Sequence, residues 1–233
     1  MSTRPVESGG SLVEHAVQAV RSHIRDHNLK VGDSLPGEGH FAAALGVSRA
    51  VMREAFGALA ALRLLDVGNG RRARVGAIDG SVIGASLDHA VTTSQISVAE
   101  VWDVRRTLEV RIAALAAERR SDEQARQILA LADAMVRDQA DMALMTAHDT
   151  QFHQVLAAST GNMLFAQIVR SFAPQMEIAV PRAWETRHAQ AEKMAILSLH
   201  RRIAEAIVNK QASEAIAAME AHFDASIGDN LAW

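Results

Sequence analysis

Two short segments with helical periodicity, Glu38–Leu45 and Ser48–Leu62, are separated only by Gly46 and Val47, and this spacing constrains the fold more than any other feature. Glycine readily takes the left-handed conformation that ends a helix, and a serine at position 48 is a good cap for the next one. Two helices joined by so short a turn form a helix-turn-helix. We therefore predict this motif at residues 38–62.

The second of these segments has an apolar side and a basic side. Phe56, Leu59 and Leu62 form an apolar stripe, whereas Arg49 and Arg53 lie one turn apart near the N-terminal end. Arginines on the leading face of a helix suit the major groove of DNA, where arginine binds guanine edges and phosphates. On spacing alone, an ordinary core helix with a solvated arginine face is an equal alternative.

The residues after this helix predict a β-hairpin with a basic tip. Residues 64–67 and 73–75 have the character of short strands, and Gly-Asn-Gly at 68–70 is a hairpin turn signal. A basic hairpin beside a helix-turn-helix is typical of a wing. A hairpin that only capped a core would not need three arginines, so the pattern favours DNA binding. The predicted DNA-binding residues are Ser48, Arg49, Arg53, Arg71, Arg72 and Arg74.

Charge and composition agree with this interpretation. Residues 1–76 hold ten Lys/Arg and seven Asp/Glu, whereas residues 77–233 hold fourteen Lys/Arg and twenty Asp/Glu. The N-terminal region is therefore basic and the rest of the chain is acidic. The chain has no cysteine, which excludes disulfides and thiolate metal sites and suits a reducing cytoplasm. No apolar run has the length of a signal peptide or a membrane span, so we expect a cytoplasmic protein without membrane contact.

The chain is expected to be mainly α, with an N-terminal winged helix-turn-helix and a C-terminal all-α antiparallel helical bundle. The expected domains are a disordered tail at 1–10, a winged-helix domain at 11–76, a linker with a short helix at 77–97 and a helical domain at 98–233. Within the helical domain, Pro174 is expected to kink or divide a helix at 163–180, and residues 181–187 are expected to form a loop.

Spacing also brings acidic and imidazole side chains together in the helical domain. Asp149 and His153 are four residues apart, hence on one helix face. His200 and His222 lie eleven residues on either side of Gln211, the centre of a predicted antiparallel hairpin, so they sit at the same height and face inward. This set suits a divalent ion with nitrogen and oxygen ligands. The alternative is a group of core histidines satisfied by carbonyls or carboxylates.

Arg105 lies on the predicted buried stripe of the helix at 98–119. An unpaired internal charge is costly, so this guanidinium needs a partner. Glu109, one turn on, is one candidate, and an anionic effector held bidentately is the other.

Residues 11–76 resemble the winged-helix domain of the GntR family of bacterial regulators. The resemblance is carried by the stretch "VGDSLPGEGHFAAALGVSRAVMREAFGALAAL" at 31–62, with its Leu-Pro-x-Glu start, Gly-Val-Ser-Arg turn and Val-x-Arg-Glu-Ala continuation. Three positions depart from the pattern. Gly39 stands where the family usually has a DNA-contacting arginine, and Arg63 and Arg72 replace glycines before and within the wing, so wing shape and operator preference do not carry over.

Residues 98–230 resemble the FCD ligand-binding domain of the FadR-type subgroup, through "VWDVRRTLE", "HDTQFHQVL", "LHRRIAEAI" and "AMEAHF". Many such domains hold a divalent metal through one aspartate and three histidines. The resemblance implies that Asp149, His153, His200 and His222 are the ligands, with zinc favoured over nickel, manganese or iron. It also implies that Arg105 binds a small carboxylate-containing effector.

These features predict a homodimeric transcription regulator, more often a repressor than an activator in this family, that binds double-stranded operator DNA. A metal ion and an organic acid would modulate that binding. One alternative is a metal-responsive regulator with no organic effector. The other is a metal-dependent hydrolase, which we disfavour because no carboxylate lies at motif spacing as a general base and because an enzyme would not need the basic wing.

Overall fold

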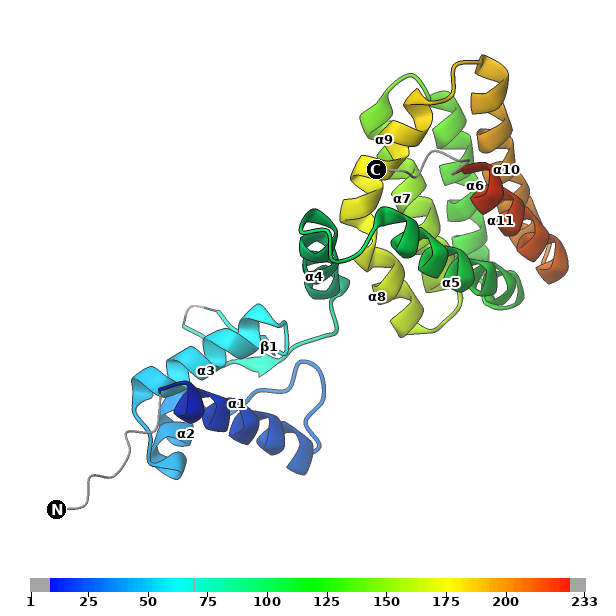
Figure 1. The fold of residues 1–233 in the computed structure, drawn as a ribbon. Coiled ribbons are helices and arrows are strands. Elements are labelled where there is room, and N and C mark those ends of the chain that lie inside the picture. The colour runs from blue at the N-terminus through cyan, green and yellow to red at the C-terminus, as the bar shows by residue number, and fades with distance from the viewer. Residues whose placement is uncertain (1–8, 69, 227–233) are drawn as a thin grey trace. The chain divides into compact units, whose positions relative to one another are not determined.

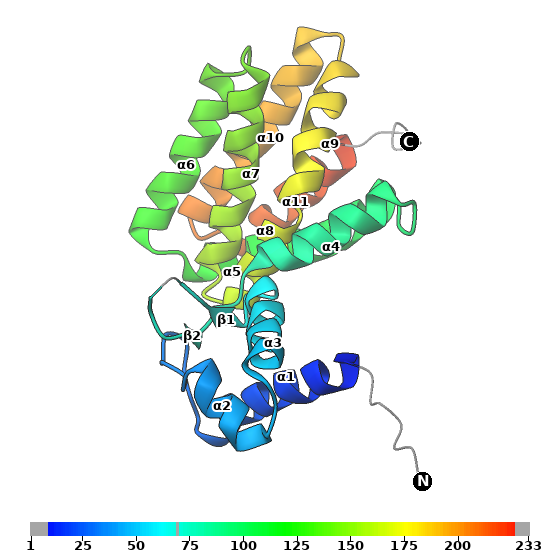
Figure 2. The same cartoon turned by 90° about the vertical axis from the view of Figure 1, so that its left-hand side faces the viewer.

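The structure is a computed structural model that describes residues 9–68 and 70–226. The chain divides into two compact units, residues 1–79 and residues 80–233. Each unit is described by itself (Figures 1 and 2).

The first unit is a three-helix domain followed by a small hairpin. Its elements are α1 (Gly9–Asp26), α2 (Glu38–Leu45), α3 (Arg49–Ala61), β1 (Leu65–Asp66) and β2 (Arg74–Val75). The helix α1 begins at Gly9, so the last two residues of the predicted tail are helical, and residues 1–8 lie outside the described part of the chain.

The predicted helix-turn-helix is confirmed, and its turn has the expected caps. Gly46 ends α2 with a φ of 67°, and its backbone N–H is directed to the carbonyl of Ala42. The Ser48 side chain accepts a 3.2 Å hydrogen bond from the N–H of Val51 and begins α3. The apolar side of α3 is buried, but Leu62 is 54% exposed because the helix ends one residue earlier, so its predicted place in the stripe is wrong.

The predicted wing is an antiparallel pair in which Leu65 lies opposite Val75. The segment before α2 bonds to the other edge of β2, since Gly32 N–H donates to Val75 O and Leu35 N–H donates to Ala73 O, each over 2.9 Å. The hairpin is thereby tied to the domain on both sides of β2. The predicted turn residue Asn69 lies outside the described residues.

The second unit consists of helices. They are α4 (Gly80–Thr92), α5 (Val98–Arg119), α6 (Asp122–Arg137), α7 (Met142–Ser159), α8 (Met163–Ser171), α9 (Ala173–Glu185), α10 (Gln190–Val208) and α11 (Ala212–Ser226). The helix α11 packs against α10 and α5, and α7 packs against α5 and α6. The helices α5, α7, α10 and α11 thus surround a common interior (Figure 1).

Two segments differ from expectation. The short helix expected within 77–97 is present as α4, but it packs on α8 as part of the second unit and does not belong to a linker. The predicted loop at 181–187 is wrong, because α9 continues through Pro181 to Glu185, held by the buried side chains of Ala179 and Trp184. Pro174 does divide the helices, since it lies in the first turn of α9, where its missing N–H is not needed.

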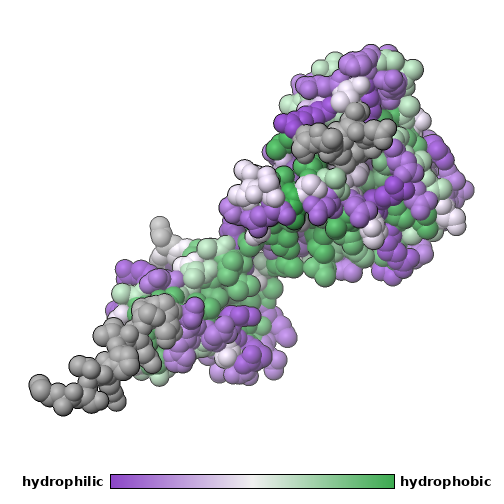
Figure 3. Space-filling model, viewed as in Figure 1, coloured by the Kyte–Doolittle hydropathy of each residue, from purple (hydrophilic) through white to green (hydrophobic). Residues whose placement is uncertain are grey.

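Hydrophobic residues gather at the visible surface of the second unit over α8 (Figure 3). Separately, Met163 and Leu164 at the start of α8 are 63% and 53% exposed. In the described part of the chain, no helix combines the length and the apolar character needed to cross a bilayer.

Candidate functional site

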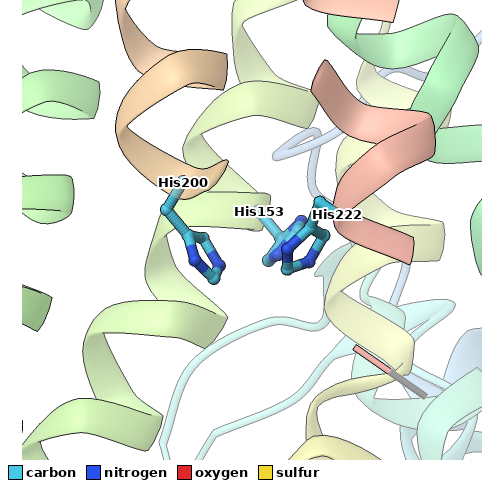
Figure 4. A group of neighbouring side chains, drawn as sticks. All are labelled: His153, His200 and His222. Atoms are coloured by element: carbon cyan, nitrogen blue, oxygen red, sulfur yellow. The ribbon is translucent and has the colours of Figure 1, made fainter. Parts of the chain in front are cut away.

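Three histidines from three helices meet in the interior of the second unit (Figure 4). His153 comes from α7, His200 from α10 and His222 from α11, and all three are buried. One nitrogen of each lies within 4.8 Å of the others. The expected meeting of His200 and His222 across the α10–α11 hairpin is seen, with ring centroids 4.4 Å apart.

Asp149 joins this cluster from the turn of α7 before His153. Its Oδ1 lies 3.0 Å from His200 Nε2, and the carboxylate is itself buried. Burial alone would raise the pKa of Asp149, but the hydrogen bond to His200 and the nearby imidazoles outweigh it and hold the pKa well below its ordinary value. The carboxylate is therefore ionised, as a metal ligand must be.

The contacts of His200 leave room for a cation. Its Nδ1 lies 3.1 Å from the carbonyl oxygen of Ile196, and its Nε2 faces Asp149. A neutral imidazole has one N–H, so it cannot donate to both acceptors. If Nδ1–H donates to the carbonyl of Ile196, the unprotonated Nε2 faces the carboxylate of Asp149 with no proton between them. A cation bound by both Nε2 and the carboxylate would remove this repulsion, and a doubly protonated imidazolium is the alternative. The donor set thus fits a divalent ion.

The other two histidines also have side-chain partners. His153 Nδ1 bonds to the carboxylate of Glu109, and Ser226 Oγ lies 3.3 Å from His222 Nδ1 and 3.5 Å from His222 Nε2. Burial first, and then the neighbouring His200 and His153, lower the pKa of His222 well below its ordinary value. His222 is therefore neutral near pH 7 and keeps a lone pair for a ligand bond.

Arg105 lies beside this cluster on α5, with 2% of its surface exposed. Its Nε donates a 2.7 Å hydrogen bond to Glu109 Oε1, which is the first of the two partners that the sequence suggested. Its guanidinium carbon also lies 4.8 Å from the ring centre of Trp102. The same arginine lines the cavity described next, so the ion pair does not remove it from contact with a ligand.

A cavity of about 440 Å³ opens onto the histidine cluster. Its wall includes Asp149 and the three histidines, together with Arg105, Trp102, Trp184 and Arg187. The sequence analysis identified neither the two tryptophans nor Arg187 as site residues. No sequence signal identifies them, because Trp102 lies on α5, Trp184 on α9 and Arg187 after the end of α9, and they share no motif spacing. A cavity of this size with one polar end suits a small organic molecule.

The predicted DNA-binding side chains lie on the first unit. Arg49 and Arg53 are exposed on α3, and Arg53 Nε lies 3.9 Å from Glu38 Oε2. A Cβ added at Gly39 would lie 3.5 Å from Arg49 Nη2, so the Arg49 side chain lies over the start of α2. It is therefore close to the position at which the family usually has a DNA-contacting arginine. The hydroxyl of Ser48 is occupied by its helix cap.

The arginines of the wing are also exposed. Arg71 Nη2 donates a 2.9 Å hydrogen bond to Asp66 on β1, which orients that side chain along the hairpin. Arg72, just before β2, and Arg74, the first residue of β2, are both exposed. The structure therefore places the six predicted DNA-binding residues in one unit and the predicted metal and effector residues in the other.

A winged helix-turn-helix with exposed arginines, followed by a helical domain with a histidine-lined cavity, defines a one-component DNA-binding regulator. Residues 12–75 match the family described as "Bacterial regulatory proteins, gntR family", and residues 100–225 match the FCD domain. The chain belongs to the GntR family of transcriptional regulators, in the group that carries an FCD domain.

Named relatives have the same character. The chain is 29% identical to the transcriptional regulator LutR of Bacillus subtilis over 85% of this chain and 92% of LutR. It is 27% identical to the transcriptional repressor NanR of Cronobacter sakazakii over 91% and 83% of the two chains. A solved Streptococcus agalactiae GntR protein superposes with a TM-score of 0.65 at 26% identity, covering 91% of this chain and 97% of that one. The prediction of a regulator and not an enzyme is confirmed.

Proposed function

We propose that this regulator senses a small carboxylate-containing metabolite through a divalent metal ion held by Asp149, His153, His200 and His222. The observation that carries the proposal is the meeting of three buried imidazoles and one ionised carboxylate at the end of a ligand-sized cavity. Three nitrogens and one oxygen suit zinc, and nickel, manganese or iron are the other candidates. When bound, the ion supplies a Lewis-acid site at which a carboxylate oxygen of the effector can bind.

The residues of the cavity supply the rest of the effector site. Arg105 offers guanidinium N–H groups for an anion at the same end of the cavity, and the indole rings of Trp102 and Trp184 provide an apolar wall. Carboxylates pair well with arginine in a buried environment because charge-assisted hydrogen bonds are stronger there. The effector class is therefore an organic acid with an apolar portion that fits within about 440 Å³.

The protein is proposed to act as a homodimeric repressor. One wing and one recognition helix per chain would then read the two half-sites of a near-palindromic operator. The name of NanR as a repressor supports this direction of control. The exposed apolar residues Met163 and Leu164 support self-association through the surface around α8.

A titration separates the effector-responsive regulator from a regulator that responds to metal alone. The purified full chain would be stripped with a chelator, and its affinity for a duplex selected from a random pool would be measured with and without Zn²⁺. We expect one Zn²⁺ per chain by elemental analysis, loss of that ion in His200→Ala, and no large change in DNA affinity with metal alone. Strong control of DNA binding by Zn²⁺ without any organic acid would instead support the metal-responsive regulator.

A further inference from the structure

The carboxylate of Glu109 lies between Arg105 and His153, two side chains that both line the cavity. Its Oε1 accepts a 2.7 Å hydrogen bond from Arg105 Nε, and its Oε2 bonds to His153 Nδ1. Glu109 is 1% exposed, so both contacts are shielded from water. Each oxygen thus has a different partner.

An ion pair alone would not require this arrangement. A carboxylate that only neutralised Arg105 could face it with both oxygens, as bidentate pairs do. Instead, one oxygen is directed to a ring nitrogen of a histidine on another helix, α7. The proton on that nitrogen is thereby fixed, because an ionised carboxylate only accepts hydrogen bonds. His153 is left with its lone pair on Nε2.

Glu109 forms a buried ion pair with Arg105, and its second oxygen is in contact with His153 Nδ1. The carboxylate is therefore placed to accept a hydrogen bond from that ring nitrogen. A histidine that ligates a metal through one nitrogen is held and made more basic when the other nitrogen donates to a carboxylate. The geometry around His153 has this form.

We propose that Glu109 is the positioning residue of the metal cluster, which selects the His153 tautomer with Nε2 free and links that ligand to the effector-binding Arg105. This inference rests on the proposed metal function. With a metal bound at Nε2, His153 Nδ1–H would be a stronger donor to Glu109, and Glu109 would hold Arg105 less tightly. The Arg105 guanidinium would then pair more readily with an incoming anion, so metal and effector binding would support each other.

The test compares Zn²⁺ affinity in the full-length protein and three variants, with the metal alone as the probe. Glu109→Gln should weaken Zn²⁺ binding about 10-fold to 100-fold, as expected for loss of a histidine-orienting carboxylate. Its Co²⁺-substituted form should also show a shifted visible absorption spectrum. Glu205→Gln is the matched control, because Arg201 Nε and Glu205 Oε1 form the same i,i+4 pair at 2.7 Å on the surface of α10. That variant should bind Zn²⁺ as the wild type does.

A double variant distinguishes positioning from simple neutralisation of a buried charge. Glu109→Gln leaves Arg105 without its partner and should lower the melting temperature of the metal-free protein. Adding Arg105→Met removes the unpaired charge and should restore the melting temperature but not the Zn²⁺ affinity. Recovery of Zn²⁺ affinity in the double variant would show that Glu109 acts only through Arg105 and would overturn the proposal.

The remaining outcomes separate this inference from the function on which it depends. Wild-type protein that binds no Zn²⁺ would overturn the proposed metal function itself. Wild-type protein that binds Zn²⁺ while Glu109→Gln binds it equally well, with an unchanged Co²⁺ spectrum, would overturn only the role of Glu109.

Discussion

The backbone N–H of Gly80 donates a 2.7 Å hydrogen bond to the side-chain oxygen of Gln167. Gly80 is the first residue of α4, so a side chain from α8 satisfies one of the free N–H groups at the start of this helix. A Cβ at Gly80 would collide with the backbone carbonyl of Gln167, and one at Gly84 would lie 3.0 Å from the carbonyl oxygen of Ser171. Glycine at these two positions lets α4 lie directly against the backbone of α8, which anchors α4 within the helical domain.

Gln167→Ala should therefore loosen α4 from α8. Loss of a helix-capping hydrogen bond costs about 1 kcal/mol, measurable as a lower urea midpoint of the full chain. Gln167→Glu should retain stability, because a carboxylate accepts the same bond and a negative charge is favourable at a helix N-terminus. The control is Gln127→Ala at an exposed position of α6. Equal midpoints for Gln167→Ala and Gln127→Ala would contradict this role of Gln167.

Arg49→Ala and Arg53→Ala should each weaken operator binding, by about 1–3 kcal/mol if the side chain contacts a base. Both are exposed on α3, and neither is among the residues that line the cavity. The Zn²⁺ content of both variants should therefore equal that of the wild type. A mobility-shift titration on a selected duplex measures the effect. Arg126→Ala, on the surface of α6, removes an arginine of similar exposure and should not alter DNA affinity. Affinity that stays at the wild-type level in both α3 variants would contradict the groove assignment.

Arg63→Gly should stabilise the first unit. Arg63 has a φ of 57°, a left-handed conformation that costs a residue with a Cβ about 1 kcal/mol relative to glycine. The gain should be seen as a higher melting temperature. Arg72→Gly is the matched control, since this second arginine at a family glycine position is not among the described residues with positive φ. A stabilisation that is the same for both substitutions would contradict the conformational explanation.

The metal-free protein should lose stability as the pH falls below about 6.5. The pKa of His222 is lower in the folded state than its ordinary value of 6.5, so the unfolded chain binds a proton more readily. Acid therefore favours unfolding in this range. The pKa of Asp149 is also lowered, but its contribution is lost only as the pH falls below the ordinary carboxyl pKa of 3.8.

Urea midpoints at about pH 7.5 and about pH 5.5, measured with chelator present, test this expectation. His222→Gln removes the titrating group and should flatten the dependence. The same slope in the wild type and in the variant would show that acid destabilisation arises elsewhere.

Local patterns in the sequence were enough to place most helices of this fold. Ser48 begins a helix where the pattern predicts one, and the Ser121–Gln124 capping box and Asn162 are further local features that begin helices. The predicted helix at 98–119 agrees with α5 at both ends. These features depend on contacts between residues three or four positions apart, and such contacts can be read along the chain.

Predictions failed where distant contacts overrode local preference. Pro181 predicts the end of a helix, yet α9 continues to Glu185 because packing of residues such as Trp184 offsets one lost backbone hydrogen bond. The helix expected within 77–97 is present, but the sequence did not show that it packs on α8 as part of the helical domain.

The sequence by itself determined the helix-turn-helix and the set of inward-facing histidines, because helical periodicity and equal distances from a turn are properties of the chain alone. Only the tertiary structure decided that Glu109 bonds to His153 as well as to Arg105, and that Trp102 and Trp184 share a cavity with the histidine cluster. Those contacts join α5, α7 and α9, and their partners depend on how whole helices pack and rotate against one another, which no spacing within one helix specifies.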